Sequence, residues 1–360
     1  MPYAIKSSEL AEFQKQLIGK WSNDENDKNL IGKDGKPLSY NVMPLPQVEP
    51  QKGYPCCLGY ILKNFAFTEE IRFNGADDPN DPHAEKDPNA LAVIARAPNR
   101  GGRYTQDSRA VFYEQKVRFA EGPHGPTGAK TEAYNKAKKR GDVVHVENGA
   151  WLHLQSVAQP LGPYDDQLPV PGPITPQPPE MAIAKQIAVP HGNSVLALGS
   201  FGGVQTGAPH IPDSKYPYPT SLKSYDFPSW DISAYPYYTK LVAADDYENP
   251  NLDLTFNPNK VLQDAVRNIK PDAFMYWVVH TDPVVVDGKD LGTGVVTNIP
   301  FEQRRANVTE YKAEYWLLSK NGGKSFDYLA YNQLIIMEIP ILGQPYIFPH
   351  VTANTVKRVP

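Results

Sequence analysis

The chain has 360 residues, of which 41% are hydrophobic and 21% charged, and its formal net charge is −4. This balance is typical of a globular protein, because a disordered chain has fewer large apolar side chains and more net charge. The 36 prolines and 21 tyrosines are unusual, since proline usage averages about 5%. A proline inside a helix costs about 3 kcal/mol, so the composition disfavours long helices and predicts an all-β fold.

The charge distribution argues against a nucleic-acid partner. Acidic and basic residues are interspersed, and the one dense cationic run, KAKKR at residues 136–140, is typical of a solvated loop. No window approaches the roughly 20 apolar residues that a membrane helix needs, and the N-terminal segment has no apolar run after its charges. We therefore expect a cytoplasmic protein with no membrane partner.

The two cysteines, Cys56 and Cys57, are adjacent. A bond between them would need a strained ring, so they can build neither a disulfide framework nor a thiolate zinc site. This cysteine usage fits a reducing compartment.

In chain order, the predicted elements are one short helix followed by strands. Apolar residues at helical spacing, behind serines that can cap, predict an amphipathic helix over residues 7–18. From residue 58 the pattern changes to runs rich in Val, Ile, Tyr and Phe, which predict strands. These strands cover residues 58–73, 90–95, 110–119, 143–154, 183–189, 194–199, 294–301, 309–318 and 325–338. We expect about ten antiparallel strands closed into one barrel domain over residues 1–360, with the last strand near the first.

Three segments of different composition interrupt the strands and are interpreted as insertions. They are residues 22–57, polar and dotted with proline; 157–181, a polyproline-type loop; and 202–290, rich in Tyr and Pro. A helix is expected at 258–268 within the third. The polyproline run could serve as an SH3-type ligand, but inside one domain a rigid surface connector is favoured.

Familiar catalytic and nucleotide-binding motifs are absent, since GxSxG, P-loop, GxGxxG, HExxH and CxxC patterns do not occur. A series of other patterns, taken in order, resembles the nitrobindin-like haem-binding β-barrels, which are similar in shape to lipocalins and fatty-acid-binding proteins. The matching segments are GKW at 19–21, FAFTEEIRF at 65–73, VFYEQK at 111–116, HVENGAWL at 145–152, the hairpins at 183–199 and 313–328, and PHVTANTVK at 349–357.

This resemblance implies a barrel that binds haem b and acts on nitrogen oxides or peroxide, for example by isomerising peroxynitrite to nitrate. It implies that His350 is the axial ligand of the iron and that His145 is a distal residue. The position of the family's pocket threonine falls at about Ile61, and Phe348 is an apolar neighbour of His350. Neutral imidazole is the common haem donor. The alternative is an ordinary surface histidine near the C-terminus.

The sequence pattern of the strand that contains His145 does not show which of its two faces points into the barrel. His145, Glu147, Trp151 and His153 share one face, whereas Val146, Ala150, Leu152 and Leu154 form the more apolar one. A β-bulge at residues 148–149 would shift the parity and let both His145 and the later apolar residues point inward. A solvent-facing His145 is the alternative.

Three other features have ordinary structural interpretations. Glu69 and Glu70 are adjacent and face opposite ways, so we expect surface charge or an ion pair with arginine rather than an acid–base pair. His280 could line a lid, but a structural histidine is favoured. The aromatic residues at 216–238 would suit stacking on a ligand, although packing explains them equally.

The leading hypothesis is therefore a haem b-binding barrel that acts on a small reactive ligand or an organic substrate at the open haem face. One alternative is a haem-free, lipocalin-like carrier of a hydrophobic ligand. Another is a haem-independent isomerase or cyclase that uses His145, Glu147 and tyrosines of the third insertion. In each case the partner is a small molecule.

Overall fold

The fold is an antiparallel β-barrel. The computed structural model describes residues 13–23, 27–33, 35–46, 60–64, 67–74, 93–94, 107–119, 143–155, 182–189, 193–213, 258–298, 307–341 and 344–360. The barrel strands are β1 (Gly19–Ser22), β4 (Phe67–Asn74), β6 (Asp107–Phe119), β7 (Val143–Gln155), β8 (Ile183–Val189), β9 (Asn193–Thr206), β10 (Ala273–His280), β14 (Asn307–Ser319), β15 (Tyr328–Ile341) and β16 (Gln344–Val359). They are hydrogen-bonded in this order, and β1 pairs back with β16. The predicted all-β closed barrel of about ten strands is confirmed.

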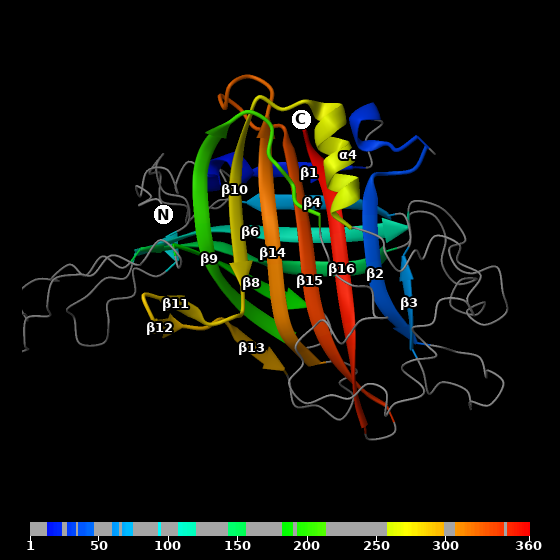
Figure 1. Cartoon of the computed structure of the whole chain (residues 1–360), viewed down its shortest axis with the longest axis vertical. Coiled ribbons are helices and arrows are strands. Elements are labelled where there is room, and N and C mark those ends of the chain that lie inside the picture. Colours follow the sequence, from blue (N-terminus) through cyan, green and yellow to red (C-terminus); the bar gives the residue numbers. More distant parts are fainter. Residues whose placement is uncertain are drawn as a thin grey trace, which may run out of the picture.

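Barrel strands that follow one another in the sequence are also neighbours in the barrel, as is usual for consecutive elements. Figure 1 shows two walls: β9, β10, β14, β15 and β16 run along the long axis, and β1, β4 and β6 cross behind them. A closed ring leaves no unpaired edge, so its inward-facing side chains form one continuous core.

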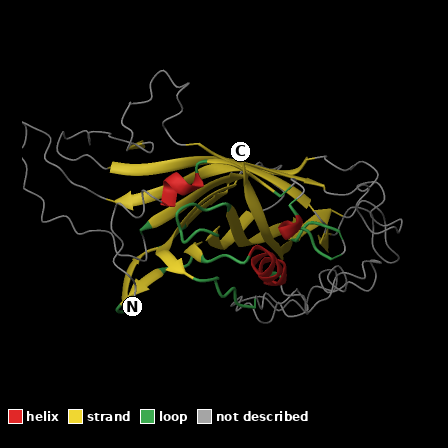
Figure 2. Cartoon of the chain, turned by 90° about the horizontal axis from the view of Figure 1, so that it is seen from above, coloured by secondary structure: helices red, strands yellow, loops and turns green. Residues whose placement is uncertain are grey.

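Smaller elements decorate the barrel. They are the 3₁₀ helix η1 (Lys28–Leu30), the strands β2 (Ser39–Pro46), β3 (Tyr60–Asn64), β5 (Val93–Ile94), β11 (Val284–Val286), β12 (Lys289–Gly292) and β13 (Val295–Asn298), and the helix α4 (Asn259–Ile269). β2 pairs with β16 and β3 with β2. α4 contacts β15 and β16 from outside the barrel (Figures 1 and 2). Within the described part of the chain, no helix has both the length and the apolar character needed to cross a bilayer.

The expected insertion at 202–290 contains part of the barrel. α4 matches the helix predicted at 258–268, whereas β10 is a barrel strand between β9 and β14. β10 was not recognised as a strand, because apolar side chains on both of its faces remove the alternation of apolar and polar residues. Trp277 is buried inside the barrel, and Tyr276 packs against Trp316 outside it. The strand β2, which pairs with β16, also lies within an expected insertion, at residues 22–57. The predicted insertion at 157–181 lies outside the described residues.

A short helical segment closes one end of the barrel. Residues 13–17 are helical, and the rest of the predicted 7–18 helix lies almost entirely outside the described residues. Phe13 packs edge-on against Trp277 at 4.4 Å between ring centroids. Trp21 Nε1 donates to Leu17 O at 2.7 Å, and the Arg358 guanidinium lies 4.3 Å from the Trp21 ring centroid and donates to Ile18 O. These contacts fix the plug to the first and last strands.

Strand β9 contains a glycine at a point of close backbone approach. A Cβ at Gly199 would lie 1.8 Å from Val278 O on β10, a distance that only movement of the two strands could relieve. We expect Gly199→Ala to lower the free energy of unfolding by about 2–3 kcal/mol, as overpacking typically does. Gly202→Ala, in the same strand, is the control, because its nearest atom is the end of the Gln205 side chain at 3.2 Å. Urea denaturation measures both, and equal losses would contradict the steric explanation.

Candidate active site in the barrel interior

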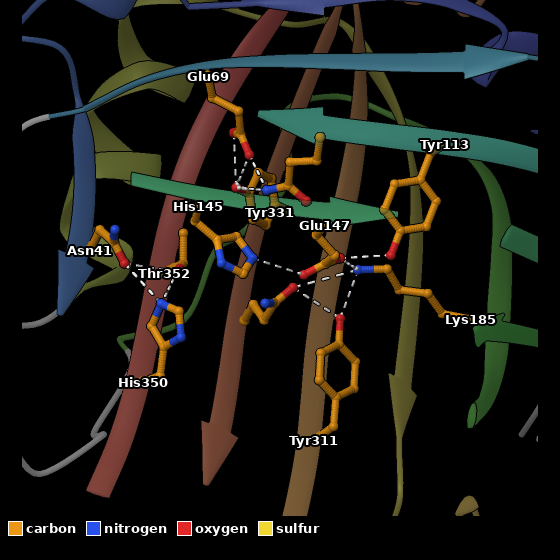
Figure 3. Close-up of polar contacts among 12 residues, drawn as sticks. Asn41, Glu69, Tyr113, His145, Glu147, Lys185, Tyr311, Tyr331, His350 and Thr352 are labelled. Carbon is orange, nitrogen blue, oxygen red and sulfur yellow. Dashed lines mark hydrogen bonds and ion pairs between the residues drawn. The ribbon is translucent and has the colours of Figure 1, made fainter. Parts of the chain in front are cut away.

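The barrel interior carries charged and amide side chains among apolar ones. Glu69 on β4, Gln115 on β6, Glu147 on β7 and Lys185 on β8 are all buried. Strand alternation places each of them on the inward face. Figure 3 shows that they gather with tyrosines into two groups, one around Lys185 and one around Glu69.

The first group is centred on the Lys185 ammonium. Lys185 Nζ lies 3.2 Å from Glu147 Oε1, 2.9 Å from Tyr311 Oη and 3.0 Å from Tyr315 Oη. Tyr113 donates to Glu147 Oε1 at 2.6 Å. An ammonium has three donors, so these oxygens can satisfy it completely inside the barrel.

This pairing decides the charge of both partners. Burial raises the pKa of Glu147, but Lys185 and then His145 outweigh it and hold that pKa well below its usual range. Burial lowers the pKa of Lys185, but the Glu147 carboxylate and Tyr315 raise it above the ordinary value. The two groups therefore form an ion pair at neutral pH.

The second group surrounds Glu69. The Tyr331 hydroxyl lies 2.7 and 2.8 Å from the two carboxyl oxygens, Asn354 Nδ2 donates to Oε2 at 2.6 Å, and Gln115 Nε2 donates to Oε1. Among the described residues, no cation pairs with Glu69. Burial raises the pKa of Glu69 to about 7, and the hydrogen bonds from Tyr331, Asn354 and Gln115 act in the opposite direction. Glu69 therefore changes its protonation state near neutral pH.

A small cavity separates the two groups. Its volume is about 20 Å³, and its lining includes Tyr113, Gln115, Lys185 and Tyr331. A space of this size holds about one water molecule. The described side chains therefore fill most of the space between the two groups.

His145 points into the barrel. Strand β7 stays in register with β6 from His145 to Trp151, so no bulge occurs at 148–149 and the His145, Glu147 and Trp151 face is the inner one. His145 Nε2 lies 3.7 Å from Glu147 Oε2, too far for a hydrogen bond. That oxygen is buried and has no hydrogen-bond partner within the described residues. The alternative of a solvent-facing His145 does not hold, because its side chain is only 12% exposed.

His350 also lies inside, on β16, and is 5% exposed. Its Nε2 is 3.0 Å from Asn41 Oδ1, which also accepts a hydrogen bond from Thr352. The His350 and His145 rings meet edge to face, with centroids 6.2 Å apart (Figure 3). The two predicted histidines thus come from distant strands to one place in the barrel.

The other predicted residues lie elsewhere or outside the described part. Ile61 is in β3 opposite Leu45, and Phe348 is in β16 opposite Met337, but their side chains are outside the described part of the structure. His280 lies on the outer face of β10, with Nδ1 4.0 Å from Asp282 Oδ2, so it does not line the interior. The aromatic segment at 216–238 is also outside the described residues.

Glu70 faces outward, opposite to Glu69. It forms ion pairs with Lys20 and Arg72, each at 2.9 Å. The expectation of surface charge is therefore confirmed for Glu70 and fails for the buried Glu69, which accepts hydrogen bonds from neutral groups.

Lys185 was not predicted as a site residue, although the sequence contains a signal. In β8 it occupies the same face as Ile183 and Ile187, both buried. A lysine on the apolar face of a strand needs a buried anion, and Glu147 on the neighbouring strand supplies it.

Comparison with known proteins finds no family model and no curated protein that matches the chain. Within the described residues, no three His, Cys, Asp or Glu side chains come together as a metal-binding group. The function is therefore argued from the interior itself.

Replacing Lys185 should test the ion pair. Lys185→Met leaves Glu147 charged and buried without its cation, which typically costs about 3–5 kcal/mol of folding free energy. The double variant Lys185→Met/Glu147→Gln removes both charges and should recover most of that loss. Chemical denaturation of the four proteins in this cycle measures the coupling, and additive losses would contradict the pairing.

Glu69 should make stability depend on pH. Its folded-state pKa of about 7 lies above the ordinary value of 4.5, so its contribution is fully present below pH 4.5 and is lost as pH rises to 7. At 1.36 kcal/mol per pKa unit, the loss is about 3 kcal/mol. Glu69→Gln has no ionisable group at this position, so it is the reference for the comparison. The difference in unfolding free energy between wild type and variant, measured from pH 4.5 to 7, should change by that amount; parallel curves would contradict the assignment.

Proposed function

We propose that the chain is a haem b-binding barrel protein in which His350 is the axial ligand and His145 acts on the molecule bound at the open face. The observation that carries the proposal is the meeting of the buried His350 ring and the largely enclosed His145 ring inside a closed ten-strand barrel. The order of motifs that resembles nitrobindin-like proteins supports the same assignment.

The chemistry of His350 fits an axial ligand. Asn41 Oδ1 only accepts hydrogen bonds, so His350 Nε2 carries the proton. A hydrogen bond from one ring nitrogen to an amide oxygen fixes the orientation of the imidazole, as outer partners do for ligating histidines. Because the His145 and His350 rings are in contact, a macrocycle at His350 requires the His145 ring to turn aside.

When bound, haem would supply an iron with an open coordination position for peroxynitrite, peroxide or an activated organic substrate. The role of the chain is then to position and move protons. A protonated His145 can be held by Glu147 Oε2, which lacks a hydrogen bond of its own. His145 could pass that proton to an oxygen of the ligand, while Lys185 keeps Glu147 ionised.

Titration of the purified protein with hemin tests the proposal. We expect one equivalent to bind with a Soret band in the wild type. His350→Ala should bind weakly and without fixed stoichiometry, because the protein bond to iron is lost. His145→Ala should keep the stoichiometry and change the reaction with peroxynitrite or peroxide.

His280→Ala is the matched control, since this histidine lies on the outer face of β10 and should leave hemin binding unchanged. An unchanged Soret maximum and stoichiometry in His350→Ala would contradict the ligand assignment. Failure of the wild type to bind hemin at all would overturn the haem proposal itself.

A second function is favoured by one observation, the His145–Glu147 pair beside a buried carboxyl group that titrates near neutral pH. Groups of the same type with separated pKa values are the arrangement of acid–base catalysis. A haem-independent isomerase or cyclase would use this pair directly. Turnover of an organic substrate by haem-free, colourless protein would identify such an enzyme, and this activity should be lost in Glu147→Gln.

A further inference from the structure

A groove on the outer wall of the barrel is separate from the interior site. It lies between η1 with its following turn and helix α4, and its volume is about 1070 Å³. Its two sides are fastened together, because Asn268 Nδ2 donates to Asn29 O at 3.2 Å. η1 is also tied to the barrel, since Asp27 pairs with Lys357 at 3.0 Å. The groove is therefore preformed.

The charge of the groove is opposite to that of the chain. Its lining includes five cations, Lys28, Lys33, Lys260, Arg267 and Lys270, and one carboxylate, Asp264, although the whole chain has a net charge of −4. Asp264 pairs with both Lys260 and Arg267. The three remaining lysines have no carboxylate partner among the described residues.

The cations are crowded enough to affect one another. Burial lowers the pKa of Lys260, the Arg267 guanidinium lowers it further, and the Asp213 carboxylate acts in the opposite direction. Some of these charges do stabilise α4, because Arg267 and Lys270 lie near its C-terminus, where cations are favoured. That effect does not explain Lys260 at the other end of α4, or Lys28 and Lys33 on the facing wall.

The dimensions favour a ligand larger than a single phosphate. Lys260 lies in the first turn of α4 and Lys270 directly follows its last turn, so the two are about 15 Å apart along the helix axis. Lys28 and Lys33 face them across the groove. Ile31 and Leu38 add apolar surface to the lining. A molecule with several phosphates and an apolar part matches this combination. The groove volume of about 1070 Å³ is just above the range of about 300–1,000 Å³ that is usual for ligand pockets, so such a molecule has room in it.

We propose that the groove between η1 and α4 binds a phosphate-bearing small molecule of nucleotide size. Phosphates lie against the cations of both walls, and the apolar part lies against Ile31 and Leu38. The site is independent of the haem proposal, because none of its residues lines the barrel interior.

Calorimetric titration of the full chain, free of hemin, with ATP, inorganic triphosphate and sulfate tests the site. We expect ATP to bind one to one, triphosphate to bind more weakly and sulfate not to bind measurably at the same ionic strength. Affinity should fall as salt is added, because the charges are exposed. The double variant Lys33→Glu/Lys270→Glu should weaken ATP binding about tenfold or more.

The control variant Arg72→Glu/Lys116→Glu makes the same charge change on β4 and β6, at surface ion pairs that contribute little to stability. It should retain ATP binding within about twofold, and thermal melting checks that both variants are folded. Equal weakening in the two variants would show a diffuse field rather than a site. Binding of an acidic peptide but not of ATP, or of sulfate as tightly as ATP, would overturn the proposed ligand class.

Discussion

The ion pair between Lys185 and Glu147 is the constraint on which the barrel interior depends. Neither charge is stable in a protein core alone, and breaking such a pair typically costs more than forming it gains. The oxygens of Tyr311, Tyr315 and Gln333 also lie within hydrogen-bond distance of Lys185 Nζ, and Tyr113 donates to Glu147. Side chains of β6, β14 and β15 therefore gather around this ion pair between β7 and β8. A closed barrel of this size could be filled with apolar residues. This one has a polar network that ties opposite walls together, and such networks must be complete to be stable.

The Lys185–Glu147 ion pair also gives the two buried glutamates different pKa values. Lys185 keeps Glu147 ionised, whereas Glu69 receives hydrogen bonds from neutral groups and also experiences the negative charge of Glu147. The pKa values of Glu147 and Glu69 are therefore shifted in opposite directions, because Lys185 lies beside Glu147 and not beside Glu69. Only Glu147 lies next to a histidine, so only Glu147 can support a proton on His145.

Much of the barrel could be predicted from local patterns, because strands with one buried face alternate in sequence. β4 is an example: Phe67, Ile71 and Phe73 mark its inner face, and Glu69 stands among them. β10 could not be recognised in this way, since its outer face is also covered by aromatic residues. The parity of β7 was open because its inner face is the more polar one, and only the partners of His145 and Glu147 on other strands explain that choice.

The site residues were predictable to different degrees for the same reason. His350 and His145 were named from the resemblance, but Asn41, which holds His350, lies on a strand inside an expected insertion. Lys185 and Tyr331 contribute through contacts with residues more than a hundred positions away. Such contacts exist only after the ring of strands has closed.

The helical plug and the two histidines lie at different levels along the barrel. Phe13 and Trp21 plug the end where β1 meets the C-terminal residues of β16, whereas His350 lies nine residues before Val359, about 30 Å along an extended strand. The cavity lined by Tyr113, Gln115, Lys185 and Tyr331, between these two levels, has room for about one water molecule. A ligand bound as proposed beside His145 and His350 would therefore lie outside this packed part of the interior. Lys185 would act on it through the charge of Glu147 rather than by contact.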